Sequence, residues 1–230
     1  METDRKWIIV RIDGKIAAAS TDYRLLASIS SYLAEQGRRQ EKKIRTGKPG
    51  NTKGCIFSKI TAEAIGLDEL WELRHKTGWE DLMLFGTDFQ KKVWHKLWEL
   101  THAYVRTTDE DNAGCDTRDG HGYPKPEDLT LVSYSDFAEL CQNRAGVRAV
   151  AHAIGLNPVA VIIPCHLVVP KESIDKIREI NKKAEATIFK GDDLCISSIL
   201  NDSSIDFGEY SCGRELKREL IIRELTGSWS

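Results

Sequence analysis

The chain has 230 residues, of which 41% are hydrophobic and 30% charged, and it is long enough to bury a sizeable core. Its formal net charge of −2 argues against a protein that coats nucleic acid through bulk charge, although a local DNA-binding face is compatible with it. No apolar run approaches the roughly 20 residues of a membrane span, and the charged N-terminus lacks the features of a secretion signal, so we expect a soluble cytoplasmic protein.

The first 80 residues have an α/β pattern. Apolar runs over 7–12 and 15–20 flank an Asp-Gly pair, which is a strong signal for a β-hairpin. Residues 22–37 have helical spacing and end at a glycine. Residues 38–54 are basic and rich in glycine, which is typical of an exposed loop, with a nucleic-acid contact as the alternative.

Residues 86–101 predict an amphipathic helix. Thr87 or Asp88 can cap its N-terminus, and apolar residues recur behind the cap at helical spacing. This predicted stripe consists of Phe89, Val93, Leu97 and Leu100. The sequence near 103–130 then breaks every periodicity and predicts a long polar insertion.

Two short helices are expected next, over 133–143 and 145–155, joined by a tight turn. The spacing suits a helix-turn-helix whose second helix carries Arg148, and an ordinary helical hairpin is the alternative. No acidic residue lies between Leu140 and Pro170, which would suit a DNA-binding face.

A β-branched apolar run over 157–163 leads into Pro164-Cys165-His166 and predicts a strand. A thiol next to an imidazole points to nucleophilic chemistry, because a thiolate is a nucleophile and an imidazole can take its proton. Each residue also has a structural alternative, since cysteine is often a small buried hydrophobe and histidine a satisfied core residue.

The six cysteines of the chain predict neither a disulfide framework nor a closed zinc site. They are scattered without a Cys-x-x-Cys pair, and in a reducing compartment they should be thiols. The six residues are Cys55, Cys115, Cys141, Cys165, Cys195 and Cys212.

The C-terminal part predicts a charged, helical insertion near 171–205 and a final helix. We expect Ser211 to cap that helix and Gly227 to end it. Its apolar face consists of Leu216, Leu220 and Ile221.

Four blocks of this sequence resemble the O6-alkylguanine-DNA alkyltransferases, and they occur in the family's order. The blocks are GTDFQKKVWHKLW (86–98), SYSDFAEL (133–140), RAVAHAIGLNPVAVIIPCHLVV (148–169) and FGEYSCGRELKREL (207–220). The third is the most specific, because Arg-Ala-Val, Asn-Pro-Val and Ile-Pro-Cys-His sit at the family's spacing. Residues 1–80 match the family poorly, and we interpret them as a diverged copy of its small α/β domain.

The resemblance implies a DNA repair protein that flips an alkylated base out of the duplex and moves the alkyl group irreversibly to its own cysteine. The base is O6-alkylguanine, with O4-alkylthymine as a second substrate. The acceptor cysteine corresponds to Cys165. The general base, which removes the thiol proton through a water, corresponds to His166, and the glutamate that orients this histidine corresponds to Glu224. Tyr134 corresponds to the tyrosine that bonds the leaving guanine and can donate a proton to it. No metal or organic cofactor is implied.

The resemblance also implies two sets of contact residues. Arg148 would fill the space of the flipped base, and Asn157 would brace the turn between recognition helix and active-site strand. The implied DNA-binding set is Arg148, Tyr134, Asn157, Ser135 and Ala149. The implied substrate-pocket set is Tyr210, Ser211, Val168 and Asn157, with the carbonyls of Cys165 and Val168 receiving the guanine amino group. Taken singly, these residues also fit packing or turn roles, and Glu224 a solvated helix charge.

This sequence departs from the family at four places, two single residues and two insertions. The family usually continues Pro-Cys-His-Arg-Val, and Leu167 stands here in place of the arginine. We expect that the family's arginine braces the pocket. There are two alternatives to this bracing role. The charge of the arginine could promote ionisation of the thiol, or the leucine could belong to a repacked pocket. Cys212 stands where many members have glycine. The insertions near 103–130 and 171–205 are extra, and mixed charge suggests that the second covers an edge rather than DNA.

We therefore expect an α/β N-terminal domain over 1–80 and, over 81–230, a mainly helical alkyltransferase domain with a winged-helix-like helix-turn-helix, acting as a monomer on double-stranded DNA. A lesion-binding relative without transfer activity is one alternative, although such relatives usually lack the acceptor cysteine. A cysteine hydrolase is another, and adjacent residues on a strand point to opposite faces, which argues against direct contact of Cys165 with His166.

Overall fold

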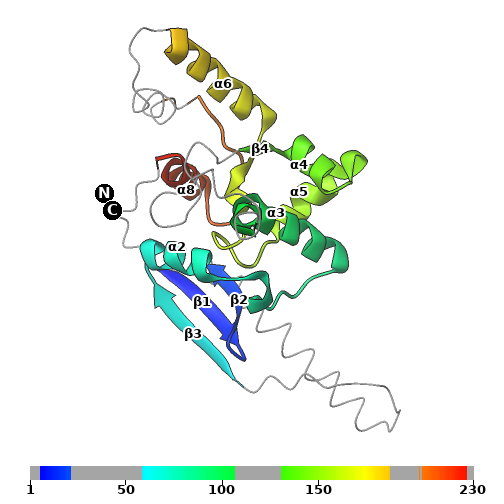
Figure 1. The fold of residues 1–230 in the computed structure, drawn as a ribbon, viewed down its shortest axis with the longest axis vertical. Coiled ribbons are helices and arrows are strands. Elements are labelled where there is room, and N and C mark those ends of the chain that lie inside the picture. Colours follow the sequence, from blue (N-terminus) through cyan, green and yellow to red (C-terminus); the bar gives the residue numbers. More distant parts are fainter. Residues whose placement is uncertain (1–5, 22–58, 107–130, 187–201, 203, 227–230) are drawn as a thin grey trace. The chain divides into compact units, whose positions relative to one another are not determined.

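Two units make up the chain (Figure 1). The computed structural model describes residues 6–21, 59–106, 131–186, 202 and 204–226. The first unit contains Met1–Phe85 and Pro158–Ile162, and the second contains Gly86–Asn157 and Ile163–Ser230. No helix within the described ranges is long and apolar enough to cross a membrane.

Several predicted features lie outside the described residues. They are the helix over 22–37, the loop over 38–54, most of the insertion near 103–130, the part of the second insertion over 187–201, and the helix stop at Gly227.

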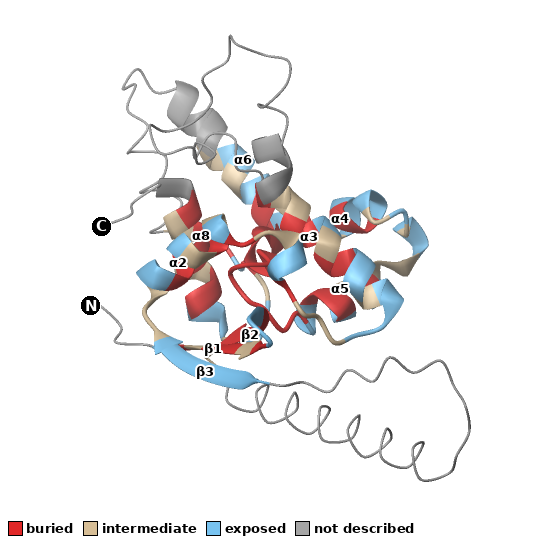
Figure 2. Cartoon of the chain, turned by 60° about the horizontal axis from the view of Figure 1, so that its bottom comes forward, coloured by how far each residue is buried: buried red, intermediate tan, exposed pale blue. Residues whose placement is uncertain are grey.

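The first unit contains a three-stranded antiparallel sheet. Strands β1 (Trp7–Ile12), β2 (Lys15–Ser20) and β3 (Ile60–Ile65) have the order β2-β1-β3. The predicted hairpin is confirmed, since Asp13 and Gly14 both have positive φ, 49° and 85°, as a two-residue turn of this twist requires. Edge strand β3 is mostly exposed, whereas β1 and β2 are largely buried (Figure 2).

Helix α2 (Leu67–Lys76) follows β3, and a 3-10 turn η1 (Trp79–Asp81) comes after it. The Glu69 carboxylate accepts from the Gly66 N–H at 2.9 Å, which satisfies one of the donors left over at a helix start. The buried side chains of Trp7, Leu70 and Trp71 belong to the core of this unit.

A segment from the C-terminal half of the chain completes the first unit. Pro158–Ile162 lies along β2, where the Ala19 N–H donates to the Pro158 carbonyl and the Ala160 N–H donates to the Ala19 carbonyl, both at 3.0 Å. Val161 in this segment has a φ of 71°, which is costly for a β-branched residue and requires support from its surroundings.

The second unit begins with helix α3 (Asp88–Arg106). Its start is a capping box, because the Gln90 N–H donates to Thr87 Oγ1 at 3.2 Å and the Thr87 N–H donates to Gln90 Oε1 at 2.8 Å. The predicted cap is thus confirmed. Val93 and Leu97 are buried as predicted, but Phe89 is 38% exposed, because the first helical turn extends beyond the core.

Both predicted short helices are present, as α4 (Tyr134–Leu140) and α5 (Val147–Gly155), with a 3-10 turn η3 (Arg144–Gly146) between them. Ser133 Oγ caps α4 by accepting from the Asp136 N–H at 3.1 Å. Trp94 Nε1 of α3 donates to the Ala153 carbonyl at 2.8 Å and so holds α5 against α3. Strand β4 (Val132–Ser133) pairs in parallel with β5 (Val168–Val169).

The predicted strand leading through Pro-Cys-His is wrong. Cys165–Leu167 form a 3-10 turn η4, closed by the Leu167 N–H and the Pro164 carbonyl at 3.1 Å. Pro164 has no N–H for a ladder, and the positive φ of Val161 bends the chain before it. The opposite-face argument against contact between Cys165 and His166 therefore loses its premise.

Two helices complete the second unit, α6 (Lys171–Ala186) and α8 (Arg214–Thr226). The predicted helical character of the second insertion is confirmed over α6. Ser211 is not the cap of the last helix, because α8 begins only after Gly213, whose φ is 101°. The predicted apolar face is confirmed, since Leu216, Leu220 and Ile221 are all buried.

Candidate functional site

A pocket of about 420 Å³ opens in the second unit, within the range of small-molecule sites. Its walls come from α4, α5, η4 and the segment that precedes α8. The lining residues are Tyr134, Ala151, Ile154, Gly155, Cys165, Glu209, Tyr210 and Ser211. The structure thus brings together four of the predicted site residues, Cys165 and Tyr134 with Tyr210 and Ser211, that lie up to 77 positions apart in the sequence.

The thiol of Cys165 lies at this pocket and is only 4% exposed. Asn157 Nδ2 lies 3.0 Å from Cys165 Sγ and donates to the Ile163 carbonyl at 2.9 Å. Burial raises the pKa of the Cys165 thiol, and the Asn157 hydrogen bond and the charge of Lys217 lower it in part. The thiol is therefore protonated at neutral pH, and a base must remove its proton before it can act as a nucleophile.

His166 and Glu224 form a buried pair directly behind the cysteine. His166 Nε2 and Glu224 Oε1 are 2.8 Å apart, and Glu224 is 6% exposed rather than solvated. An ionised carboxylate only accepts hydrogen bonds, so Nε2 carries the ring proton and Nδ1 is the basic nitrogen. The Tyr210 ring meets the imidazole edge-on, with 6.5 Å between ring centroids.

Tyr134 begins α4 and contributes to the lining of the pocket. Burial raises the pKa of the Tyr134 phenol, and the negative charge of an ionised Cys165 raises it further. The phenol therefore keeps its proton at neutral pH and is available as a hydrogen-bond donor beside the cysteine.

Lys217 is a site residue that the sequence prediction missed. Its side chain is 1% exposed, and Nζ donates to the carbonyls of Val168 at 2.7 Å and Glu209 at 3.4 Å. Nζ also lies 5.6 Å from the centre of the Tyr134 ring. Burial lowers the pKa of Lys217 to about 8, so most of the side chain is charged at neutral pH.

A signal in the sequence could have found this lysine. Lys217 and Glu224 are seven positions apart, with Leu220 and Ile221 between them at helical spacing. This spacing sets both charged residues on the apolar face of α8, where a charge needs a partner.

The remaining predicted residues lie outside the pocket lining. Arg148 and Ala149 are exposed at the start of α5, and exposed Ser135 forms a hydroxyl pair with Ser133 at 2.8 Å. The Val168 carbonyl, predicted to receive a guanine amino group, accepts from Lys217, and its second lone pair can take another donor. In the described part of the chain no cluster of histidine, cysteine or acidic residues could hold a metal ion.

Comparison with known proteins points to one family. A family model described as the DNA-binding domain of 6-O-methylguanine DNA methyltransferase matches residues 129–186. The predicted resemblance to O6-alkylguanine-DNA alkyltransferases is thereby confirmed, and the matched residues include α4, α5, Cys165 and His166.

Curated relatives agree with this match over part of their length. A probable methylated-DNA–protein-cysteine methyltransferase of Acanthamoeba polyphaga mimivirus is 38% identical over 93 residues, 40% of this chain and 45% of the relative. The inducible enzyme of that name from Bacillus subtilis is 29% identical over 123 residues, 54% of each chain. This chain thus spans about half the length of the curated relatives it matches. A solved structure of Mycobacterium tuberculosis OGT in complex with DNA is 23% identical, with a TM-score of 0.35 and coverage of 63% of this chain and 54% of that one.

We predict that Lys217→Met lowers the reactivity of Cys165. The cation lowers the thiol pKa, so its removal should raise that pKa and move the pH profile of thiol alkylation to higher pH. The rate of labelling by iodoacetamide, mapped to the Cys165 peptide, measures this at a series of pH values. Lys171→Met, which removes an exposed lysine, is the matched control and should leave the profile in place. An unshifted profile in Lys217→Met would show that the ammonium does not act on the thiol.

We also predict that Leu167→Arg destabilises the protein. Leu167 is 1% exposed, which favours the repacked-pocket alternative over a site that awaits an arginine. A guanidinium forced into this position lacks a prepared partner, and the free energy of unfolding should fall by about 3 kcal/mol or more. Urea denaturation measures the change, and Leu167→Met should cost less than about 1.5 kcal/mol. An unchanged stability for Leu167→Arg would mean that the pocket still accommodates the family's arginine.

Proposed function

We propose that this chain, which resembles the O6-alkylguanine-DNA alkyltransferases, is a methylated-DNA–protein-cysteine methyltransferase that acts once. It transfers a methyl or small alkyl group from O6 of guanine, or from O4 of thymine, to Cys165. The observation that carries the proposal is the meeting, at one pocket, of the buried thiol of Cys165 and the protonated phenol of Tyr134. The residue next to the thiol in the sequence is His166, whose imidazole is held by a buried carboxylate.

The chemistry follows from the protonation states of these groups. His166, held by Glu224 at 2.8 Å, takes the thiol proton through a water. The Cys165 thiolate attacks the alkyl carbon, an S–C bond forms, and the O6–C bond breaks with its electron pair left on the guanine. Tyr134 donates a proton to the leaving guanine, and the raised pKa of its phenol supports this donor role. The thioether that results has no leaving group for water to displace, which explains a single turnover.

The other predicted pocket residues have supporting positions. Tyr210 lies on the pocket wall, where its ring can pack against the base, and the Ser211 N–H is available for O6. The carbonyls of Cys165 and Val168 receive the guanine amino group. Asn157 supports the active-site turn, because its side chain bonds both the Ile163 carbonyl and the cysteine sulfur.

We propose that double-stranded DNA binds over α4 and α5. The exposed side chains of Arg148, Ala149 and Ser135 support this surface, since they lie on the two helices that also line the pocket. Arg148 fills the space of the flipped base, which offsets part of the few kcal/mol that unstacking costs. A winged-helix-like arrangement that enters the minor groove is part of this proposal.

Two alternative functions differ from the proposed alkyl transfer in what they leave on the protein. A lesion-binding relative without transfer activity is disfavoured by the presence of Cys165. A cysteine hydrolase would use the same thiol and imidazole but would release its product and turn over repeatedly. A stable mass increase on the protein therefore separates the alkyltransferase from both.

The wider organisation is proposed on the same resemblance. We infer an N-terminal domain over 1–80, derived from the family's small α/β domain, and an alkyltransferase domain over 81–230. The protein acts as a monomer without a cofactor, in the cytoplasm or nucleoid of a prokaryote or the nucleus of a eukaryote.

We predict that incubation with a duplex containing O6-methylguanine adds about 14 Da, one methylene equivalent, to the intact protein. Peptide mapping should locate the increase to Cys165. Cys165→Ser should bind the lesion and gain no mass, and Cys141→Ser, which changes a half-buried cysteine outside the pocket, should gain it normally. Methylation of another cysteine, or none in the wild-type protein, would contradict the proposed function.

We predict that Arg148→Ala impairs transfer from duplex DNA more than transfer from the free modified base. The arginine matters only when a base leaves the stack, so the single-turnover rate on duplex should fall by about tenfold or more while the free-base rate changes little. Arg144→Ala removes another exposed arginine, from the turn before α5, and should have the smaller effect. Equal losses on both substrates in Arg148→Ala would show that the residue is structural.

A further inference from the structure

One wall of the pocket lacks regular secondary structure. Residues 205–211, here called the wall segment, contribute Glu209, Tyr210 and Ser211 to the pocket but form neither helix nor strand. Backbone groups in such a segment need partners elsewhere, and its position depends on what it packs against. Its neighbours therefore control the place of Tyr210 and Ser211 in the pocket.

Helix α6 of the second insertion packs against one side of the wall segment. Ile205 and Phe207 are buried against Ile174 of α6 in a hydrophobic cluster. The Ser173 hydroxyl donates to the Asp206 carbonyl. Lys176 Nζ donates at 2.6 Å to the carbonyl of Ser204, the residue immediately before the wall segment. The complete cluster comprises Val169, Ile174, Ile205, Phe207 and Ile221, with Leu131, Ile177 and Ile180 partly buried around it.

Helix α8 contacts the same segment. Arg218 donates to the Ile205 carbonyl at 3.3 Å and the Asp202 carbonyl at 3.1 Å, and its guanidinium lies 5.4 Å from the centre of the Phe207 ring. At Gly208, whose φ is 82°, an added Cβ would lie 3.2 Å from the ring of Pro170, the residue before α6. The wall segment thus contacts both helices, and at Gly208 the ring of Pro170 leaves little room for a side chain.

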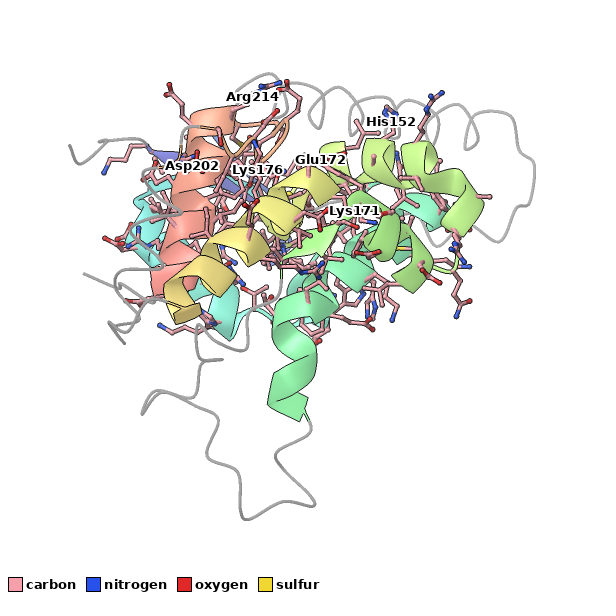
Figure 3. The ribbon with its side chains drawn as sticks, turned by 90° about the horizontal axis from the view of Figure 1, so that it is seen from above. His152, Lys171, Glu172, Lys176, Asp202 and Arg214 are labelled. Carbon is pink, nitrogen blue, oxygen red and sulfur yellow. The ribbon has the colours of Figure 1, made fainter. Side chains whose placement is uncertain are left out.

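The outward side of α6 does not favour a role in DNA binding. Lys171 and Glu172 at its start are exposed, and Lys176 is exposed as well although its Nζ bonds the Ser204 carbonyl (Figure 3). Within the described first ten residues of α6, the exposed side chains carry three positive and three negative charges, which gives no net attraction for phosphate. These six residues are Lys171, Glu172, Asp175, Lys176, Arg178 and Glu179.

We infer that α6 is a positioning element of the pocket, which fixes the wall segment and thereby limits the size of the alkyl group that can face Cys165. The inference rests on the proposed alkyl transfer and adds to it a determinant of substrate range. Without packing against the insertion, the segment would belong to a long flexible loop. A wall held by contacts with both α6 and α8 instead resists the displacement that a larger group would require. The insertion therefore contributes to specificity rather than merely covering an edge.

Substrate discrimination tests this role. Single-turnover rates are measured on one duplex that carries either O6-methylguanine or O6-benzylguanine. Ile174→Ala should slow methyl transfer by about tenfold, because the wall is less well positioned, and slow benzyl transfer less, because the wall can yield. Ile174→Val should restore the wild-type ratio of the two rates. Leu70→Ala truncates a buried leucine in the first unit and should leave the ratio unchanged. The same ratio in Ile174→Ala as in the wild-type protein would overturn the inference.

Amide hydrogen exchange tests the positioning independently of any transfer. Exchange over residues 205–211 should accelerate in Ile174→Ala and stay at the wild-type rate in Leu70→Ala. Unchanged exchange in Ile174→Ala would overturn the role of α6 even if alkyl transfer occurs. A wild-type protein that acquires no alkyl group would instead overturn the proposed function, and the exchange result would still decide whether α6 positions the wall.

Discussion

At the pocket, the burial of Cys165 opposes the ionisation that the proposed alkyl transfer requires. A buried thiol is protected from water and held in one place, but burial opposes the charge of the thiolate and raises the thiol pKa. The amide of Asn157 and the ammonium of Lys217 offset part of this effect. In the proposed function the His166–Glu224 pair supplies a base, and the hydrogen bond to the buried carboxylate keeps the imidazole in one tautomer. All of these buried polar groups would favour the thiolate form of Cys165, which accounts for their presence in an apolar region.

Helix α8 supplies two of these groups, Lys217 and Glu224, from a single element. Lys217 and Glu224 are separated by two helical turns and lie on the same face as Leu220 and Ile221, which anchor that face in the core. Arg218 extends the role of the helix by holding the backbone of the wall segment. A rotation or shift of α8 would therefore disturb the base, the cation and the wall together. We expect substitutions in its apolar face to affect both stability and transfer for this reason.

The turn that contains Cys165 is held by a few hydrogen bonds from one side chain, Asn157. The chain enters the first unit at Pro158–Ile162 and returns at Ile163, two residues before Cys165. Asn157 closes this excursion, because its amide lies within bonding distance of both the Ile163 carbonyl and Cys165 Sγ. The unfavourable φ of Val161 is tolerated because the backbone around it is fixed on both sides. The position of the sulfur follows from this closed excursion and not from a regular strand.

The sequence by itself determined the features that depend on near neighbours along the chain. Asp13-Gly14 predicted the hairpin, Thr87 predicted the start of α3, and the spacing around Arg148 predicted α4 and α5, since turns, caps and helical periodicity are local properties. The Pro-Cys-His tripeptide and the blocks around it also identified the family resemblance. Only the tertiary structure decided that Cys165 lies in a 3-10 turn, that Lys217 is buried beside Tyr134, and that α6 packs against the wall segment. Burial and its effects on pKa arise from residues far apart in the chain, and no local pattern specifies which of them meet.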